Sequence, residues 1–490
     1  QAEDGIRDVE RSRGLGDVYK RQVHYLGIRK NEAFIQWVPP GLAPCLAYPT
    51  PLQTAKEFSS TLKGKLFFCC VKEHGREKTI RLLRDEASKS YLPVKQMLKQ
   101  ILRTVPSGEK GAENDFLTAR MFSGLHTDGL PWSGVRARLK LFEKDSNQAQ
   151  FNFHTVFSPR TGKTVMTLTR EFEKSHKEKV VVAMNGGYML NPELVGKLGL
   201  PEKYIGSPLG LVIKNQKILS LPLYNKPAFV IKTDFTISIQ RANLKDGLKI
   251  SVPGGDSLEL SGEDRNNENS EKPVYFDLMY SKSEINAKGR IIYRFAGNRI
   301  IAKIRNQLEK VNLLPVGLTV SVSEDMQLKG WEVDAEVEYH IPGWDDVLQA
   351  VEAGPSLVRE GKIAIEMVEE GWKTRNSIAT QAARVDYEHL RGPKIGAGLT
   401  PDNELVIVAI NGRIRESVGA THRELAKILV DEGCVQAMGF DPGGSVTLIV
   451  HGKQLNVTPY NQNYDDNPYS LPPQPRRIGS AILITDSKID

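Results

Sequence analysis

The segment from Gly433 to Val450 constrains this chain more than any other, because it places one carboxylate in a stiff glycine turn between two apolar runs. Pro442 fixes its own φ at about −65° and favours an extended conformation at Asp441. Gly443 and Gly444 can take positive φ and let a ligand approach their N–H groups. We predict a strand, a tight turn and a second strand, with Asp441 at the bend. An ordinary hairpin, in which the aspartate only satisfies turn backbone, is the alternative.

A second segment has a similar design. The apolar run from Val180 to Met184 leads into Asn185, Gly186 and Gly187. The sequence therefore again predicts a buried strand that ends where the backbone bends and lies close to another group. An amide at such a strand end can orient hydroxyl groups, so Asn185 is the strongest candidate site residue after Asp441.

Length and charge limit the function classes. A chain of 490 residues exceeds one ordinary domain and predicts roughly two to four. The net charge of +7 comes from 66 basic and 59 acidic residues that are scattered along the sequence. Nucleic acid is therefore not predicted as a partner, whereas phosphate or acidic glycans are compatible with this charge. No apolar run approaches the roughly twenty residues that span a bilayer, so no membrane span is predicted.

The sequence predicts neither a metal site nor a cofactor, because it has no H-E-x-x-H motif and no paired cysteines at metal-ligand spacing. We predict that most of the thiols are buried and leave a single disulfide open. The four cysteines are Cys45, Cys69, Cys70 and Cys434.

Composition divides the chain into regions. Residues 1–22 resemble translated adaptor sequence and are set aside from fold reasoning, which leaves export to the periplasm open. Residues 23–110 predict a helical or irregular N-terminal region. A main domain is expected over residues 135–484, with a β-rich insertion at 228–341.

Two helices are predicted close to the candidate residues. The segment from Trp344 to Glu352 has helical spacing and ends at Gly354–Pro355. Thr421 and Glu424 have the spacing of a capping box, which predicts that a helix opens there and continues over 425–432.

Seven motifs, taken in their order, resemble the phosphodiester glycosidase family. They are NGGY at 185–188, GSPLG at 206–210, AGPSLVREGK at 353–362, INGR at 410–413, GATHRELAKIL at 419–429, GFDPGGS at 439–445 and RRIGSAIL at 476–483. The resemblance covers roughly residues 151–484. It implies an α+β fold with a mixed β-sheet core and flanking helices, and hydrolysis of a sugar-1-phosphodiester. The implied partner is a carbohydrate or glycosyl-phosphate substrate.

The resemblance also assigns residues. The family's D-G-G-G-S loop falls on Asp441, Gly443, Gly444 and Ser445, its N-G-G on 185–187, and its arginine before the last strand on Arg476. This chain departs from the family at Pro442, where glycine is usual, and at Asn411, where aspartate is common.

The chemistry of a glycosyl phosphate needs a carboxylate near the anomeric carbon and donors or cations around the phosphate. We predict Asp441 as base or nucleophile, with Asn185 and Glu352 as further catalytic candidates. Glu352 could instead be a solvated helix residue, and Asp386 is another candidate for the second carboxylate. The substrate-binding candidates are the glycine N–H groups of Gly186, Gly187, Gly443 and Gly444 together with Ser445, Arg413 and Arg476.

Two other functions compete with this hypothesis. A non-catalytic glycan-binding protein on the same fold is suggested by the missing aspartate at position 411. A phosphate-binding transferase is disfavoured, because no Lys-Ser/Thr pair follows the glycines. The sequence leaves the sugar and the oligomeric state open.

Overall fold

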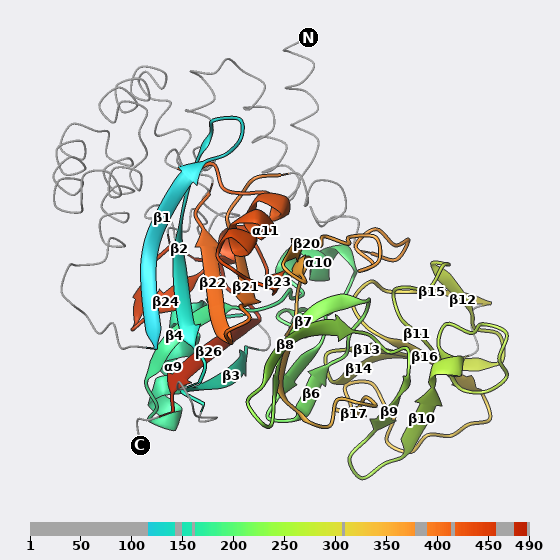
Figure 1. Ribbon diagram of the computed structural model, residues 1–490. Helices are drawn as coiled ribbons and strands as arrows, with labels where there is room; N and C mark the ends of the chain where they lie inside the picture. The colour runs from blue at the N-terminus through green and yellow to red at the C-terminus, as the bar shows by residue number, and fades with distance from the viewer. Residues whose placement is uncertain are drawn as a thin grey trace, which may run out of the picture.

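The computed structural model describes residues 116–142, 149–158, 162–305, 309–377, 390–412, 417–456 and 475–487 (Figure 1). Residues 1–22 and 23–110, the candidates Arg413 and Asp386, and three of the four cysteines lie outside these ranges. Within the ranges, no helix has both the length and the apolar character needed to cross a membrane.

The described part of the chain is built from antiparallel sheets, so the predicted α+β core with flanking helices is wrong. Only three α-helices occur in these residues: α9 (Val165–His176), α10 (Pro192–Lys197) and α11 (His422–Asp431). The predicted helix over Trp344–Glu352 is instead strand β18 (Val347–Glu352). This strand is buried on both faces, and a continuous buried run cannot be assigned to helix or strand by periodicity. The capping box at Thr421 is confirmed, since its hydroxyl accepts from Glu424 N–H at 3.1 Å.

One layer of the fold is a seven-stranded sheet, in the order β1-β2-β22-β21-β23-β19-β20. Helix α11 covers its outer face, where Leu425 and Leu429 pack against Val406 and Val408. In order, the strands are β1 (Leu117–Leu125), β2 (Pro131–Lys140), β22 (Glu404–Ile410), β21 (Lys394–Leu399), β23 (Gln436–Gly439), β19 (Ser356–Arg359) and β20 (Lys362–Ile363).

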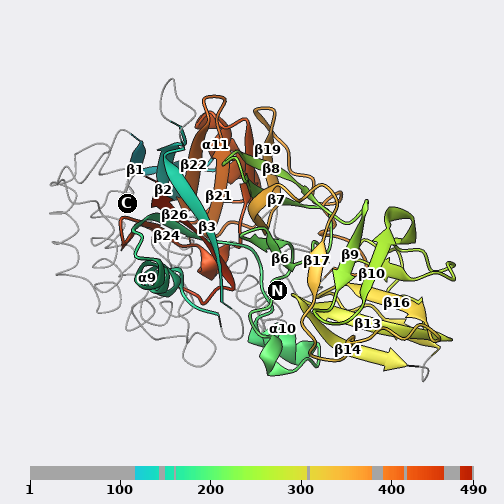
Figure 2. The same cartoon turned by 90° about the horizontal axis from the view of Figure 1, so that it is seen from below.

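The second layer is a five-stranded sheet, in the order β25-β24-β4-β26-β3. Its inner face packs against the seven-stranded sheet through residues such as Val182 and Leu448, and α9 lies on its outer face (Figure 2). The strands are β25 (Lys453–Gln454), β24 (Leu448–Val450), β4 (Val180–Asn185), β26 (Ser480–Asp486) and β3 (Phe151–Phe157).

A third sheet, β6-β5-β18-β7-β8, joins this sandwich to a β-rich lobe. Phe229 of β7 belongs to the sandwich core, whereas the adjacent Ala228 and Val230 belong to the core of the lobe, because neighbouring side chains of a strand point to opposite faces. The strands are β6 (Lys217–Ser220), β5 (Val212–Lys214), β18, β7 (Lys226–Lys232) and β8 (Ile237–Ala242).

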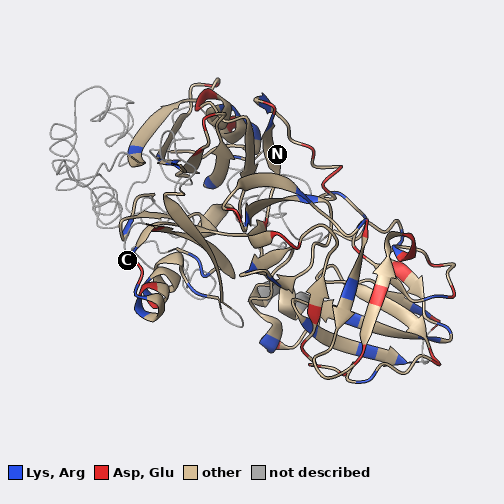
Figure 3. Ribbon diagram, turned by 60° about the horizontal axis from the view of Figure 1, so that its bottom comes forward, with Lys and Arg blue, Asp and Glu red and all other residues tan. Residues whose placement is uncertain are grey.

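The lobe itself contains three small sheets, which lie together on one side of the molecule (Figures 1 and 2). On its strands, Lys and Arg are interspersed with Asp and Glu (Figure 3). The strands are β9 (Gly247–Ser251), β10 (Ser257–Ser261), β11 (Val274–Phe276), β12 (Glu284–Asn286), β13 (Arg290–Ala296), β14 (Arg299–Arg305), β15 (Lys310–Asn312), β16 (Thr319–Ser323) and β17 (Glu338–His340).

The turn at Asp441 connects the two layers of the sandwich. Strand β23 before it lies in the seven-stranded sheet, and β24 after it lies in the five-stranded sheet. The turn is therefore not a hairpin. Gly443 has a φ of 72°, a conformation that favours glycine, and a single 3-10 turn (Gly443–Ser445) carries the chain across.

Candidate functional site

Asn185, at the end of β4, holds the Asp441 turn in place. Its Nδ2 donates to the backbone carbonyl of Asp441 at 2.8 Å, and its Oδ1 accepts from Thr447 N–H at 3.0 Å. The N–H of Asp441 donates in turn to the carbonyl of Gly186 at 3.2 Å. Asn185 is fully buried, so the structure gives its amide a positioning role at Asp441.

The Asp441 carboxyl is half-buried, and this loss of solvent raises its pKa to about 6. The neighbouring Ser445 hydroxyl and the Arg476 guanidinium favour the ionised form and partly oppose the shift in pKa. Ser445 Oγ is buried and has no hydrogen bond of acceptable geometry to any described residue. Arg476 is held in place because its N–H donates to the carbonyl of Gly444 at 3.0 Å. Asp441, Ser445 and Arg476 thus form one cluster.

The glycines at 186 and 187 are required by close packing. A Cβ on Gly187 would lie 2.2 Å from the carbonyl oxygen of Glu352, and a Cβ on Gly186 would lie 2.5 Å from Ser480 Oγ. Gly186 N–H donates to the Ser480 carbonyl at 2.8 Å, and Gly187 N–H donates to Ser480 Oγ at 3.2 Å. Gly443 N–H likewise donates to the Pro393 carbonyl at 2.9 Å. These three N–H groups were predicted to bind substrate, but each already donates a hydrogen bond to another residue of the chain.

Glu352 ends strand β18 and is buried, so it is not a solvated helix residue. Its Oε2 accepts from Leu211 N–H at 2.9 Å, while the buried Oε1 has no hydrogen-bond partner among the described residues. Burial raises the pKa of this carboxyl to about 8, although the nearby Lys226 opposes the shift. The glycine at 210 makes room for the carboxyl, because a Cβ there would lie 2.9 Å from Oε1.

Lys226 is a site residue that sequence reasoning missed. It opens strand β7 and is 5% exposed, with Nζ 3.8 Å from the ring centroid of Trp372 and 4.4 Å from that of Tyr224. The Tyr188 ring, at 5.6 Å, completes an aromatic cage. Burial lowers the pKa of the amine to about 8. The available signal was a lysine directly before the apolar run from Pro227 to Ile231.

Glu370 links the cage residue Trp372 to Arg241 and is not among the residues singled out from the sequence. Its carboxylate is fully buried and accepts from Trp372 Nε1 at 2.6 Å and from Ser356 N–H at 2.8 Å. Arg241 forms an ion pair with it at 2.7 Å. The Glu370 carboxylate, held by these three partners, therefore fixes the Trp372 indole against Lys226.

The segment at 185–188 contacts the backbone at both candidate acidic residues. Its first residues hold the Asp441 turn, Gly187 packs on the backbone of Glu352, and the Tyr188 hydroxyl donates to the Gly354 carbonyl at 3.3 Å. Among the described residues, no group of three or more His, Cys, Asp or Glu side chains could hold a metal ion.

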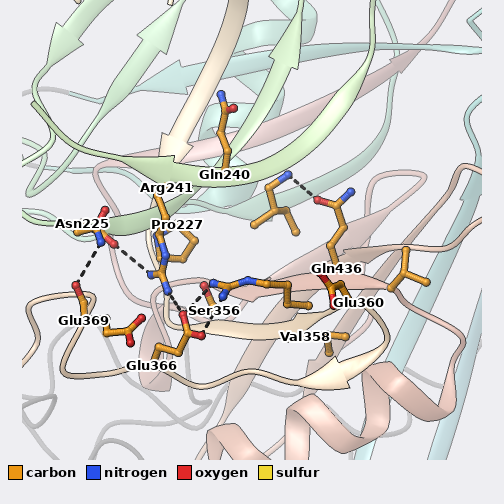
Figure 4. A pocket seen from close by; sticks show the side chains of 13 residues that line it. Asn225, Pro227, Gln240, Arg241, Ser356, Val358, Glu360, Glu366, Glu369 and Gln436 are labelled. Carbon is orange, nitrogen blue, oxygen red and sulfur yellow. Dashed lines mark hydrogen bonds and ion pairs between the residues drawn. The ribbon is translucent and has the colours of Figure 1, made fainter. Parts of the chain in front are cut away.

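A cleft of about 780 Å³ lies apart from these carboxyl groups, between strands β7–β8 and strands β19 and β23 (Figure 4). Neither Asp441 nor Glu352 lines it. The predicted site residues that the structure describes therefore do not line this cleft.

A comparison with known proteins agrees with the five motifs that follow residue 286. The sequence model of the phosphodiester glycosidase family matches residues 286–485, which confirms the resemblance and supports a hydrolase of the glycosidase type. A curated relative, the SPbeta prophage-derived uncharacterized protein YomE of Bacillus subtilis (strain 168), is 33% identical over 84 residues. The match spans 17% of this chain and only 13% of that relative.

Three solved structures are similar to the chain at low identity. A hypothetical protein from Synechocystis has a TM-score of 0.46 and 15% identity, over 76% of this chain and 62% of that one. A putative exported protein from Burkholderia pseudomallei K96243 has a TM-score of 0.42 and 16% identity, and the match covers 72% of this chain and 74% of that one. The third structure is the catalytic domain of zebrafish N-acetylglucosamine-1-phosphodiester alpha-N-acetylglucosaminidase, auto-inhibited by its pro-peptide. Its TM-score is 0.41 at 14% identity, and the match covers 78% of this chain and 87% of that one.

Proposed function

Because residues 286–485 match the phosphodiester glycosidase family, we propose that this protein hydrolyses a sugar-1-phosphodiester on a glycan or a cell-envelope polysaccharide. One observation carries the proposal. The segment at 185–188 contacts both the Asp441 turn and the backbone of Glu352, so one short segment connects two acidic residues with different surroundings.

The difference in acidity suggests a division of roles. With pKa values of about 6 and about 8, Asp441 is mostly ionised and Glu352 mostly protonated at neutral pH. Asp441 would act as base or nucleophile at the anomeric carbon. The bond from that carbon to the phosphate oxygen breaks, and Glu352 would supply a proton to the departing phosphate. Water supplies the new hydroxyl of the sugar.

Arg476 would neutralise phosphate charge, since it lies near enough to Asp441 to affect its pKa. A phosphate monoester is a good leaving group, so proton donation by Glu352 would matter less than the carboxylate of Asp441. We therefore assign the larger share of the rate to Asp441.

Two observations favour a second candidate, a glycan-binding protein without turnover. Asn411 stands where the family commonly has aspartate, and the structure buries it completely, with Nδ2 donating to Ser133 Oγ at 3.2 Å. The N–H groups of Gly186, Gly187 and Gly443 are used within the chain. Fewer donors would then remain for a phosphate.

The deciding experiment incubates the purified protein with the methyl phosphodiesters of glucose-1-phosphate, galactose-1-phosphate and N-acetylglucosamine-1-phosphate and measures released reducing sugar. We expect turnover that Asp441→Asn lowers by about a thousandfold, since a general base or nucleophile contributes on this scale. Asp431→Asn, an exposed aspartate on α11, is the matched control and should leave turnover unchanged. Equal turnover by Asp441→Asn would remove that residue from its role, and binding without turnover would favour the second candidate.

A further inference from the structure

The cleft between strands β7–β8 and strands β19 and β23 has the size of a ligand site. Its volume of about 780 Å³ falls within the range of about 300 to 1,000 Å³ that is usual for small-molecule sites. The edge strand β8 forms one wall, and the end of the seven-stranded sheet forms the other (Figure 4).

Two polar groups at the base of the cleft are fixed in place and have hydrogen-bonding capacity left. Ser356 is 6% exposed, and its N–H is held by Glu370 at 2.8 Å, yet its hydroxyl makes no hydrogen bond to any described residue. Gln436 is anchored because its Oε1 accepts from Ile239 N–H at 2.9 Å. Its Nε2 bonds to none of the described side chains or backbone groups. A hydroxyl and an amide N–H thus line the cleft in defined positions.

The cations of the cleft are already neutralised. Arg359 binds the two oxygens of Glu366 at 2.9 and 2.8 Å, and Arg241 binds the same carboxylate from the opposite wall (Figure 4). The exposed carboxylates of Glu360 and Glu369 also line the cleft, and neither has a side-chain partner among the described residues. Three carboxylates against two guanidinium groups disfavour phosphate, sulfate or another anion.

Apolar side chains complete the lining. Pro227 and Ile239 come from the β7–β8 wall, and Val358 and Val435 come from the opposite one. A suitable ligand would place hydroxyl groups against Ser356, Gln436 and the free carboxylates, and C–H faces against these apolar residues. An uncharged oligosaccharide has this combination of surfaces.

We propose that this cleft is a second carbohydrate-binding site, which takes a neutral oligosaccharide and is separate from the region of Asp441. None of the thirteen lining residues is aromatic, so no ring stacks on the sugar and the affinity is modest. The site does not depend on the proposed hydrolysis.

The test uses the full chain carrying Asp441→Asn, so that hydrolysis does not consume the ligand. Cellohexaose, maltohexaose, laminarihexaose and chitohexaose are titrated by calorimetry, with hexagalacturonate and hexalysine as charged probes. We expect a neutral hexasaccharide to bind with a Kd of about 0.1 to 5 mM. Added substitutions Ser356→Ala and Glu369→Gln should each weaken binding by about 3- to 10-fold, the value of one hydrogen bond.

Glu259→Gln, an exposed glutamate on β10 far from the cleft lining, is the matched control and should leave the Kd unchanged. Unchanged binding in both cleft variants, failure of all four neutral sugars to bind, or tighter binding of either charged probe would overturn the proposal. Because each arm measures binding in a protein that lacks the Asp441 carboxylate, a negative result here leaves the test of hydrolysis untouched. Absence of turnover in the native chain likewise leaves this test intact.

Discussion

The Asp441 turn and the end of strand β18 place two carboxyl groups in contrasting surroundings. Asp441 is half-buried beside Ser445 and Arg476, and its pKa rises only to about 6. Glu352 is buried, its Oε1 has no hydrogen-bond partner in the part of the chain that the structure describes, and its pKa rises to about 8. Burial is the largest cause of the raised pKa at both carboxyls, and a nearby cation opposes it at both. The surroundings differ in their other partners: the Ser445 hydroxyl favours the ionised form of Asp441, whereas the carboxylate of Glu370 raises the pKa of Glu352 further.

Substitution of each carboxyl group in turn should give the largest effects and should show whether Asp441 and Glu352 have different roles. We expect Glu352→Gln to lower kcat by about a hundredfold, the lower end of general acid catalysis, against the larger loss for Asp441→Asn. The profile of kcat/KM against pH should rise near pH 6 as Asp441 ionises and fall near pH 8 as Glu352 loses its proton. Glu352→Gln should remove the fall at high pH. A profile that keeps this limb in the variant would contradict the role of Glu352.

The connection between the two regions can be tested at Gly187. A Cβ at this position would lie 2.2 Å from the backbone oxygen of Glu352, so Gly187→Ala must displace either the 185–188 segment or β18. We expect a loss of about 1 to 3 kcal/mol in the free energy of unfolding, measured in urea, and a drop in turnover. Gly196→Ala in helix α10 is the control, because no described heavy atom beyond its chain neighbours and the helix backbone lies within 4 Å of the added Cβ. Equal stability of both variants would show that this contact does not position Glu352.

How far the sequence predicts these regions depends on whether the determining contacts are local. Strand β4 covers the apolar run predicted as a buried strand, the helix after Thr421 begins at its capping box, and Gly443 takes a positive φ. Each of these features is set by neighbouring residues. The sequence therefore predicts them well.

Contacts between distant segments could not be predicted in the same way. Asn185 and Asp441 are separated by 256 positions, and nothing local to either residue shows that the amide binds the aspartate carbonyl. The Glu352 segment is buried on both faces, so its periodicity does not separate a strand from a helix. The cage around Lys226 is assembled from three segments, and only the folded chain places Trp372 over the amine.

Asp441→Asn should have opposite effects on activity and on stability. Below about pH 4 the carboxyl is protonated in both folded and unfolded chains, so its raised pKa has no effect there. As pH rises from 4 to 6 the unfolded chain ionises first, and the folded state loses about 1 to 3 kcal/mol relative to an uncharged residue. We therefore expect Asp441→Asn to raise the Tm at pH 8 and to leave it unchanged at pH 4. A lower Tm at pH 8 would mean that the charged carboxylate stabilises the fold.

The smallest expected effect comes from Lys226→Met. This substitution removes the positive charge near Glu352 while the Glu352 side chain stays buried. Methionine has a similar length and packs well among aromatic rings, so the cage of Tyr188, Tyr224 and Trp372 should remain filled. Because the Lys226 charge lowers the pKa of Glu352, its removal should move the high-pH limb of kcat/KM further upward while the low-pH limb stays in place. Lys217→Met, an exposed lysine on β6, should move neither limb. A shift of the high-pH limb to lower pH would show that the Lys226 charge does not lower the pKa of Glu352. The difference between the pKa values of Asp441 and Glu352 would then have to be explained without this cation.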